Sequence, residues 1–333
     1  MSRILIPDAQ FPDDYALERK AAAPCELQVA RAKDPDDIAA ADWAAADALV
    51  VYHRMTYGAE VAARCPKVRL LCRVGVGVDN VDLAAWTARG AAVCNVPDYG
   101  TDEVADHAVA MILALARGLF AYQARLAGGR RSDFVPLPVP DQVRRLSGAR
   151  LLLLGLGPIA VATARRAQAF GIDVAAWAPR MKGGMDKALG IRREHDLAAA
   201  LAGADIVSLH LALTPETRNL IDAGAIAAMR PGALLVNTAR GALVDLDALT
   251  AALRDGRLGG VALDVFPVEP PDPGHPLIAA VREGADWALG RVVLSPHAAW
   301  ASPDAMADMR RGAILTARRF LLDGVLGNAV ATP

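Results

Sequence analysis

The sequence is short of cysteine, of long hydrophobic runs and of any excess of one charge, and each shortage excludes a class of protein. Its longest apolar runs, LLLLGLG and AVAMILALA, fall well short of the roughly 18 residues that a membrane-spanning segment needs. The 36 basic and 37 acidic residues leave no basic surplus for binding nucleic acid. We therefore expect no membrane and no nucleic acid as partner, and a small molecule becomes the expected ligand.

Cysteine usage and the amino terminus bear on metal binding and location. The four cysteines include no CxxC pair and no matching histidine spacing, which favours free, mostly buried thiols over a zinc site: Cys25, Cys65, Cys72 and Cys94. The first ten residues, MSRILIPDAQ, contain one basic residue and a short β-type run without a small-residue cleavage pattern. The sequence therefore predicts no metal site and a cytoplasmic location.

Short apolar strands alternate with alanine-rich helical stretches along almost all of the 333 residues, which is about twice the usual domain length. Continuous rather than alternating hydrophobicity is typical of parallel strands that helices cover on both faces. The expected strands of the first hundred residues are 3–7, 48–52, 68–74 and 91–96. A second series begins at 151 and continues with 173–178, 204–211, 233–239, 260–266 and 291–297. Both series indicate an α/β fold with parallel sheets.

Three further segments set the expected domain organisation. Residues 102–129 have apolar positions at helical spacing for longer than a typical helix, and 131–149 form a polar, proline-rich connector. Residues 302–324 read as one amphipathic helix, with Ser302 as its N-cap and Gly324 as its stop. We expect a ligand in a cleft between two domains, which are a substrate domain of residues 1–102 and 301–333 and a dinucleotide-binding domain of residues 103–300 inserted into it.

A glycine turn, GLGPIA, follows the four-leucine strand and opens a helix. In such a turn Gly155 permits the tight bend, Gly157 lets the backbone approach a pyrophosphate, and Ala160 permits close packing of helix on strand. The helix amino terminus then faces the phosphates with its free amides. The alternative is a strand-to-helix turn that is merely glycine-rich. The cofactor-binding residues expected here are Gly155, Leu156, Gly157, Pro158 and Ile159, although Pro158 has no N–H to donate.

The end of the next strand bears on which cofactor binds. An acid at this position would accept hydrogen bonds from a ribose 2′-hydroxyl and repel a 2′-phosphate, but the chain has Ala178 here and Arg180 two residues later. This pattern favours NADP(H) over NAD(H), with Arg180 on the phosphate. Arg180 as a solvated turn residue is the alternative, and an enzyme that lacks the acid can still use NADH weakly.

Five stretches in order around this turn resemble the D-2-hydroxyacid dehydrogenase family. They are RVGVGVDNVDL (73–83), NVPDYGTDEVADHAVAMILALAR (95–117), NTARGALVDLDALTAAL (237–253), GVALDVFPVEPP (260–271) and LSPHAAW (294–300). AVCNVPDYGTDEVAD and PHAAW are most similar to the branch that includes the C-terminal binding proteins and their bacterial dehydrogenase relatives. The resemblance implies two doubly wound parallel-sheet domains, a Rossmann cofactor domain inserted into a flavodoxin-like substrate domain.

The resemblance also implies a catalytic trio, and each member suits its place after a strand. Arg240 would hold the carboxylate of a 2-oxoacid bidentately and polarise its ketone. His297 would exchange a proton with the carbonyl oxygen, because imidazole has an unperturbed pKa near 6.5. Glu269 would hydrogen-bond this imidazole and fix its orientation. Taken alone, the two charged residues would more often be solvated and the histidine structural.

Other positions take roles from the same resemblance. Asp264 would accept a hydrogen bond from the nicotinamide carboxamide, and Thr238 and Ala239 would also contact the cofactor. The substrate-binding residues would be Arg73, the backbone amides of Val76 and Gly77, and Trp300, for which packing in the core is an equal alternative. If Arg73 and Arg240 both face the pocket, a diacid becomes a plausible substrate. His107 and His210 are second-rank candidates without an assigned role.

These observations predict an NAD(P)-dependent 2-hydroxyacid dehydrogenase, or 2-oxoacid reductase, that moves a hydride between nicotinamide and C2 of a small anionic acid. A homodimer is expected, formed through the helix 102–129. Two alternatives stay open: a nucleotide-sensing, corepressor-like binding protein, and a phosphite- or formate-type dehydrogenase on the same fold.

Overall fold

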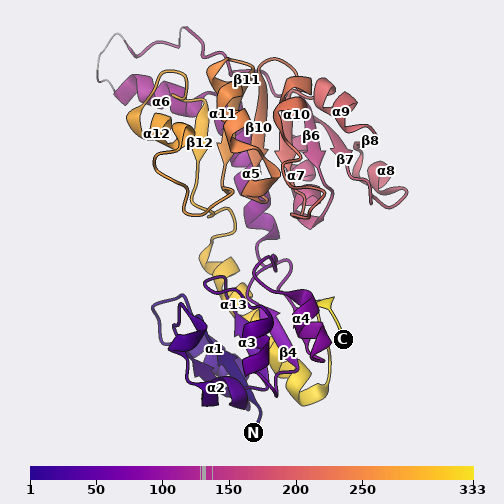
Figure 1. Cartoon of the computed structure of the whole chain (residues 1–333). Helices are drawn as coiled ribbons and strands as arrows, with labels where there is room; N and C mark the ends of the chain where they lie inside the picture. Colours follow the sequence, from indigo (N-terminus) through magenta and orange to yellow (C-terminus); the bar gives the residue numbers. More distant parts are fainter. Residues whose placement is uncertain (128, 130–132, 137) are drawn as a thin grey trace. The chain divides into compact units, whose positions relative to one another are not determined.

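The computed structural model describes the chain except for residues 128, 130–132 and 137, and it divides into two compact units (Figure 1). Unit 1 comprises Met1–Gly100 and Ala301–Pro333, and unit 2 comprises Thr101–Trp300. Each unit contains one mainly parallel sheet with helices between its strands, so the α/β prediction with two parallel sheets is confirmed. The boundaries expected from the sequence lie within two residues of these.

The sheet of unit 1 has the strand order β13-β5-β4-β3-β1-β2, and only β13 runs antiparallel to its neighbour. Its strands are β1 (Arg3–Ile6), β2 (Glu26–Val29), β3 (Ala48–Val51), β4 (Leu70–Arg73), β5 (Ala92–Cys94) and β13 (Ala329–Ala331). Its helices are α1 (Ala16–Ala22), α2 (Ala40–Ala45), α3 (Ala59–Arg64), α4 (Leu83–Ala88) and α13 (Pro303–Asp323). The edge strands β2 and β13 were not expected, because they contain few of the buried apolar residues that mark the inner strands.

The last helix, α13, begins and ends where the sequence predicts. The Ser302 hydroxyl accepts a hydrogen bond from the Ala305 N–H at 2.9 Å, and Gly324 closes the helix in the left-handed conformation at φ +68°. Within α13 the buried Arg310 forms ion pairs with Glu18 of α1 and with Asp13. These pairs fasten the carboxyl-terminal helix to the amino-terminal part of unit 1.

The sheet of unit 2 is entirely parallel, with the order β12-β11-β10-β9-β6-β7-β8. Its strands are β6 (Arg150–Leu154), β7 (Asp173–Trp177), β8 (Arg192–Glu194), β9 (Ile206–Leu209), β10 (Ala233–Asn237), β11 (Leu258–Leu263) and β12 (Val292–Leu294). Its helices are α5 (Thr101–Ala116), α6 (Leu119–Ala127), α7 (Pro158–Ala169), α8 (Met185–Leu189), α9 (Leu197–Gly203), α10 (Ala223–Ala228), α11 (Leu246–Arg254) and α12 (Pro276–Glu283). Strand β8, which reads RRE, was missed because it is a charged edge strand.

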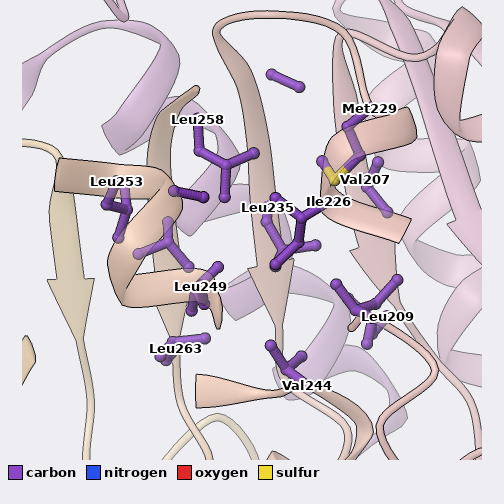
Figure 2. Close-up of a cluster of buried hydrophobic side chains, with 14 of the residues drawn as sticks. Val207, Leu209, Ile226, Met229, Leu235, Val244, Leu249, Leu253, Leu258 and Leu263 are labelled. Atoms are coloured by element: carbon purple, nitrogen blue, oxygen red, sulfur yellow. The ribbon is translucent and has the colours of Figure 1, made fainter. Parts of the chain in front are cut away.

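Both faces of this sheet are buried, which explains its continuous apolar strands. Alternate residues of one strand enter different clusters: Leu235 of β10 packs on one face, and Leu234 and Val236 on the other. Figure 2 shows the first cluster, in which Leu249 and Leu253 of α11 lie over the strands. Burying each such leucine contributes about 1.5–3 kcal/mol, so the clusters hold the strand ends rigidly in place.

The expectation of a single helix over 102–129 is wrong. Two helices, α5 and α6, are bent by 60° at a break where Gly118 adopts φ +62°, a conformation that a helix cannot contain. Among the described residues no single helix is long and apolar enough to cross a membrane, and only this bent pair reaches the required length and composition. Residue 128 lies outside the described residues. So do 131, 132 and 137 of the connector, whose described part, 133–136 and 138–149, contains no α-helix or strand.

Candidate active site

The three catalytic residues expected from the sequence all lie at one edge of the sheet of unit 2. Strands β10, β11 and β12 are neighbours and run parallel, so their carboxyl ends meet at the same edge. Arg240 follows β10, Glu269 follows β11 and His297 follows β12. The loops after these strands therefore bring together three residues that are distant in the sequence.

Glu269 and His297 form a directly hydrogen-bonded pair. The distance from His297 Nδ1 to Glu269 Oε2 is 2.7 Å, and Glu269 Oε1 accepts the backbone N–H of Phe266 at 2.9 Å. A carboxylate can only accept, so Nδ1 carries the proton and Nε2 remains for exchange with a ligand. Burial raises the pKa of Glu269, but the hydrogen bonds from His297 and Phe266 and the charges of His297 and Arg240 outweigh it, so this pKa lies below its ordinary value. Glu269 is thus an ionised partner for the imidazole at neutral pH.

Arg240 is held by a turn that packs against the loop of Glu269. The buried Asn237 side chain accepts the Ala239 N–H at 3.0 Å and donates to the Arg240 carbonyl at 2.9 Å. At Gly241 an added Cβ would lie 1.9 Å from the Phe266 carbonyl carbon, so only glycine fits this contact. Sequence reasoning missed Asn237 as a residue that shapes the site. Its position could have indicated this role, because it is a polar residue at the end of an otherwise apolar strand.

Asp264 is buried and holds the loop that carries His297. The side chain is 1% exposed, and its carboxylate accepts the backbone N–H groups of Ala298 at 2.8 Å and Ala299 at 3.0 Å. His297 itself has φ +53°, a left-handed conformation that costs a non-glycine residue about 1–2 kcal/mol. The structure therefore gives Asp264 a role within the protein, while its contact with the nicotinamide carboxamide stays a prediction.

The glycine turn has the geometry that dinucleotide binding requires. Gly155 adopts φ +99°, and a Cβ there would lie 2.6 Å from the His210 carbonyl oxygen, so a side chain is excluded. A Cβ at Gly157 would meet nothing within 4 Å, which leaves open space in front of α7. Helix α7 has no side-chain cap, so its first-turn amides remain for an anion, except at Pro158. Ala160 is fully buried, as the packing argument predicts.

The other cofactor residues expected from the sequence lie along the same edge. Arg180 is exposed just beyond β7, and Thr238 is buried beyond β10. Within the described part of the chain the Thr238 hydroxyl has no hydrogen-bond partner, which fits a polar group of a bound cofactor. The hydrogen bond from Thr214 lowers the pKa of Glu216, and so does the positive charge of Arg180. Arg180 therefore lies within electrostatic reach of the Glu216 carboxylate. Leu156, Ile159 and Ala239 are partly exposed.

Three of the expected substrate residues belong to unit 1, where they gather after β4. Arg73 ends this strand and donates through Nη1 to the Val74 carbonyl at 2.7 Å. Its guanidinium lies over Gly75, where a Cβ would come within 1.7 Å of Nη1. Val76 is exposed and Gly77 is partly exposed, and anion binding by their backbone amides stays a prediction. Trp300 is partly exposed at the last position of unit 2.

The two second-rank histidines occupy different environments. Burial lowers the pKa of His210 to about 4, so its imidazole is neutral, and Nε2 lies 2.9 Å from the Ser208 hydroxyl. His107 projects from α5 and contacts Ser295 beside the loop of His297. Across the described residues there is no group of three or more His, Cys, Asp or Glu side chains that could hold a metal ion.

Comparisons with known proteins show the family of this chain. Residues 109–299 match the family model for the D-isomer specific 2-hydroxyacid dehydrogenase NAD binding domain. The chain is 37% identical over 295 residues to D-3-phosphoglycerate dehydrogenase of Mycobacterium tuberculosis (strain CDC 1551 / Oshkosh), an alignment that covers 88% of this chain and 52% of that protein. The chain thus spans about half the length of this curated relative.

Solved structures are similar over nearly the whole chain. A protein of Thermus thermophilus superposes with a TM-score of 0.84 at 34% identity, covering 99% of this chain and 100% of that one. D-lactate dehydrogenase of Aquifex aeolicus, complexed with NAD and lactic acid, gives 0.83 at 26% identity and covers 99% of each chain. An NADPH-dependent glyoxylate/hydroxypyruvate reductase of Sinorhizobium meliloti gives 0.84 at 28% identity, covering 99% and 97%. The chain belongs to the D-isomer specific 2-hydroxyacid dehydrogenase family, and residues 109–299 correspond to the NAD binding domain of that family.

Proposed function

We propose that this protein is a 2-oxoacid reductase, equivalently a 2-hydroxyacid dehydrogenase, that uses a nicotinamide cofactor. The observation that carries the proposal is the His297–Glu269 pair, 2.7 Å apart, beside Arg240 at the carboxyl edge of a dinucleotide-binding sheet. Two structural relatives are, by name, a lactate dehydrogenase and a glyoxylate/hydroxypyruvate reductase, which supports a small 2-oxo or 2-hydroxy acid as substrate.

Each residue of the site has a separate role in the proposed reaction. The reduced cofactor, when bound, supplies the hydride that adds to C2 of the oxoacid. Arg240 binds the carboxylate through two parallel N–H donors and polarises the ketone. His297 donates the proton on Nε2 to the ketone oxygen, so that hydride and proton together convert the ketone to the alcohol. Glu269 keeps Nδ1 protonated and stabilises the imidazolium before the transfer.

Other residues of the proposal contribute to binding. Arg73 and the amides of Val76 and Gly77 bind the anionic end of the substrate, and Trp300 lies against its side chain. With Arg73 and Arg240 both engaged, diacids and other strongly anionic oxoacids are favoured. Asp264 and Thr238 would hold the cofactor. Asp264 would accept a hydrogen bond from its carboxamide, and the Thr238 hydroxyl, which has no partner among the described residues, would bind one of its polar groups.

The cofactor we propose is NADP(H) in preference to NAD(H). Ala178 is buried where an acid would bind a ribose 2′-hydroxyl, and Arg180 is exposed two residues later, where it can pair with a 2′-phosphate. Glu216, near Arg180, opposes this preference by competing for the guanidinium. One structural relative is described as NADPH-dependent, which supports the choice.

We also propose that the protein is a homodimer that pairs through α6. This helix buries none of its residues and exposes Leu119, Phe120 and Leu126 at 57%, 46% and 47%. Apolar side chains at this density are typical of an interface. Sedimentation of the wild type and of Phe120→Glu tests this: a dimer that becomes a monomer in the variant supports the proposal, and a monomeric wild type contradicts it.

A panel of 2-oxoacids with both reduced cofactors tests the function. Glyoxylate, hydroxypyruvate, phenylpyruvate and branched 2-oxoacids are each combined with NADPH and NADH, and oxidation of the cofactor is followed by absorbance. We expect turnover of at least one acid, with a higher kcat/KM for NADPH. No oxidation with any acid would contradict the proposal and favour a corepressor-like binding protein or a phosphite- or formate-type dehydrogenase.

We also propose that the chain belongs to the branch of the family that includes the C-terminal binding proteins. This assignment rests on the similarity of the stretches AVCNVPDYGTDEVAD and PHAAW.

A further inference from the structure

A chain of hydrogen bonds leads from α5 to the loop of His297. His107 Nε2 lies 2.9 Å from the Ser295 hydroxyl oxygen, across 188 residues of sequence, and this hydroxyl lies 2.5 Å from Asp264 Oδ1. A carboxylate only accepts, so the single hydroxyl hydrogen of Ser295 goes to Asp264. The Ser295 oxygen can then only accept from His107, which fixes the proton of this imidazole on Nε2.

Asp264 is the point at which this chain reaches the backbone around His297. Besides the Ser295 hydroxyl, its carboxylate accepts the Ala298 and Ala299 amides, and its own carbonyl accepts the His297 amide at 2.7 Å. Glu269 holds the imidazole ring, whereas these bonds hold the backbone from which the ring projects. The strained φ of +53° at His297 needs this support, because a non-glycine residue leaves such a conformation when its surroundings loosen.

At the other end of this series of hydrogen bonds, His107 lies on helix α5, which is packed firmly within unit 2. Helix α5 packs on α7 and the sheet through a buried face, and Arg166 of α7 forms ion pairs with Asp102 at 2.8 Å and with Asp106, the neighbour of His107, at 2.5 Å. Helix α5 is also the first element of unit 2, and the loop of His297 is its last segment. His107 therefore joins the two segments through which the chain enters and leaves this unit.

We infer that His107 is a positioning residue of the reaction, which acts through Ser295 and Asp264 to keep His297 at its place on the sheet edge. The inference rests on the proposed function for its catalytic consequence, but not for the structural link itself. His107 acts on the position of His297 and not on the reacting atoms, so its loss should lower kcat more than it weakens cofactor binding.

Four variants test the catalytic consequence. His107→Leu removes the hydrogen-bond donor, and His107→Gln keeps an N–H donor at similar reach. Ser295→Ala breaks the series of hydrogen bonds one step later. His195→Leu is the matched control, because His195 is an exposed histidine of the same unit. We expect His107→Leu to lower kcat about 10- to 100-fold, as small misplacements of a catalytic group do, with a smaller change in the KM for the cofactor. His107→Gln should recover most of this loss, and His195→Leu should match the wild type.

The double variant decides whether the effect passes through Ser295. If it does, His107→Leu adds little in the Ser295→Ala background, because the path is already broken. Full multiplication of the two losses would overturn the inference, as would a wild-type kcat in His107→Leu. If His107→Leu does not fold, Ser295→Ala and Ser295→Thr decide, with only the alanine variant expected to be slow.

Amide hydrogen exchange separates this inference from the proposed function. Without any substrate, peptides containing residues 297–299 should exchange faster in His107→Leu and Ser295→Ala than in the wild type and His195→Leu. Faster exchange in a protein that reduces no oxoacid would support the link and reject the function. Unchanged exchange with normal turnover would reject the link and leave the function in place.

Discussion

In both units a buried carboxylate and an asparagine hold the loops at the carboxyl edge of a parallel sheet. In unit 1 Asp8 accepts the backbone amides of Tyr52 at 2.8 Å and Arg54 at 3.1 Å, much as Asp264 accepts those of Ala298 and Ala299 in unit 2. Asn80 donates to the carbonyls of Tyr52 and Met55, as Asn237 fastens the turn of Arg240.

The loops held in this way carry different chemistry. Those of unit 1 present the cations Arg54 and Arg73, whereas those of unit 2 present an imidazole hydrogen-bonded to a carboxylate. In the function we propose, similar fastening therefore serves anion binding in unit 1 and proton transfer in unit 2. The changes tested below in unit 1 should therefore act on substrate binding, and those tested in unit 2 on the chemical step or on cofactor choice.

The largest effect is expected from His297→Ala in unit 2. Loss of the general acid should lower kcat about 10²- to 10⁴-fold, while the Kd for cofactor stays close to that of the wild type. Steady-state kinetics and cofactor fluorescence titration measure the two quantities. His195→Ala serves as the control, because that histidine is exposed and distant from the site in sequence. A loss below tenfold would mean that another group supplies the proton.

A glycine substitution in unit 1 should give the opposite signature. In Gly75→Ala the new Cβ would meet Arg73 Nη1 and move the guanidinium, so we expect the KM for the oxoacid to rise about tenfold with little change in kcat. Gly90→Ala is the matched control, since Gly90 has a similarly positive φ, +81°, but open space at its Cβ position. Equal effects in both variants would show that backbone strain, and not Arg73, is responsible.

Cofactor choice should depend on unit 2 alone. Arg180→Ala should lower the ratio of kcat/KM for NADPH over NADH about tenfold, because a charged hydrogen bond to phosphate is lost. Glu216→Gln should raise the same ratio, because it releases Arg180 from a competing acid. A ratio that neither variant changes would remove Arg180 from the cofactor site.

The sequence predicted the parts of this arrangement that depend on local pattern. Inner strands such as β10 were predicted because both faces are buried. Arg240, Glu269 and His297 were chosen from motifs that follow strands, and they lie in the loops after β10, β11 and β12, while their catalytic roles stay predictions. The break at Gly118 was missed, because apolar residues continue at helical spacing across it. The contact of His107 with Ser295 spans 188 residues and leaves no local signal, so only the folded chain reveals it.

The smallest expected effect is a pair of opposite pH dependences. Burial raises the pKa of Asp8 above 3.8, so its contribution to the free energy of unfolding is present below that value and is lost as pH rises through the raised pKa. The pKa of Glu269 lies below 4.5, so its contribution is present above 4.5 and is lost as pH falls through the lowered pKa. In urea unfolding, the stability of the wild type relative to Asp8→Asn should therefore fall with pH, and relative to Glu269→Gln it should rise. If the stability of the wild type relative to Asp8→Asn and that relative to Glu269→Gln changed with pH in the same direction, the expected contrast between the two carboxyl groups would be contradicted.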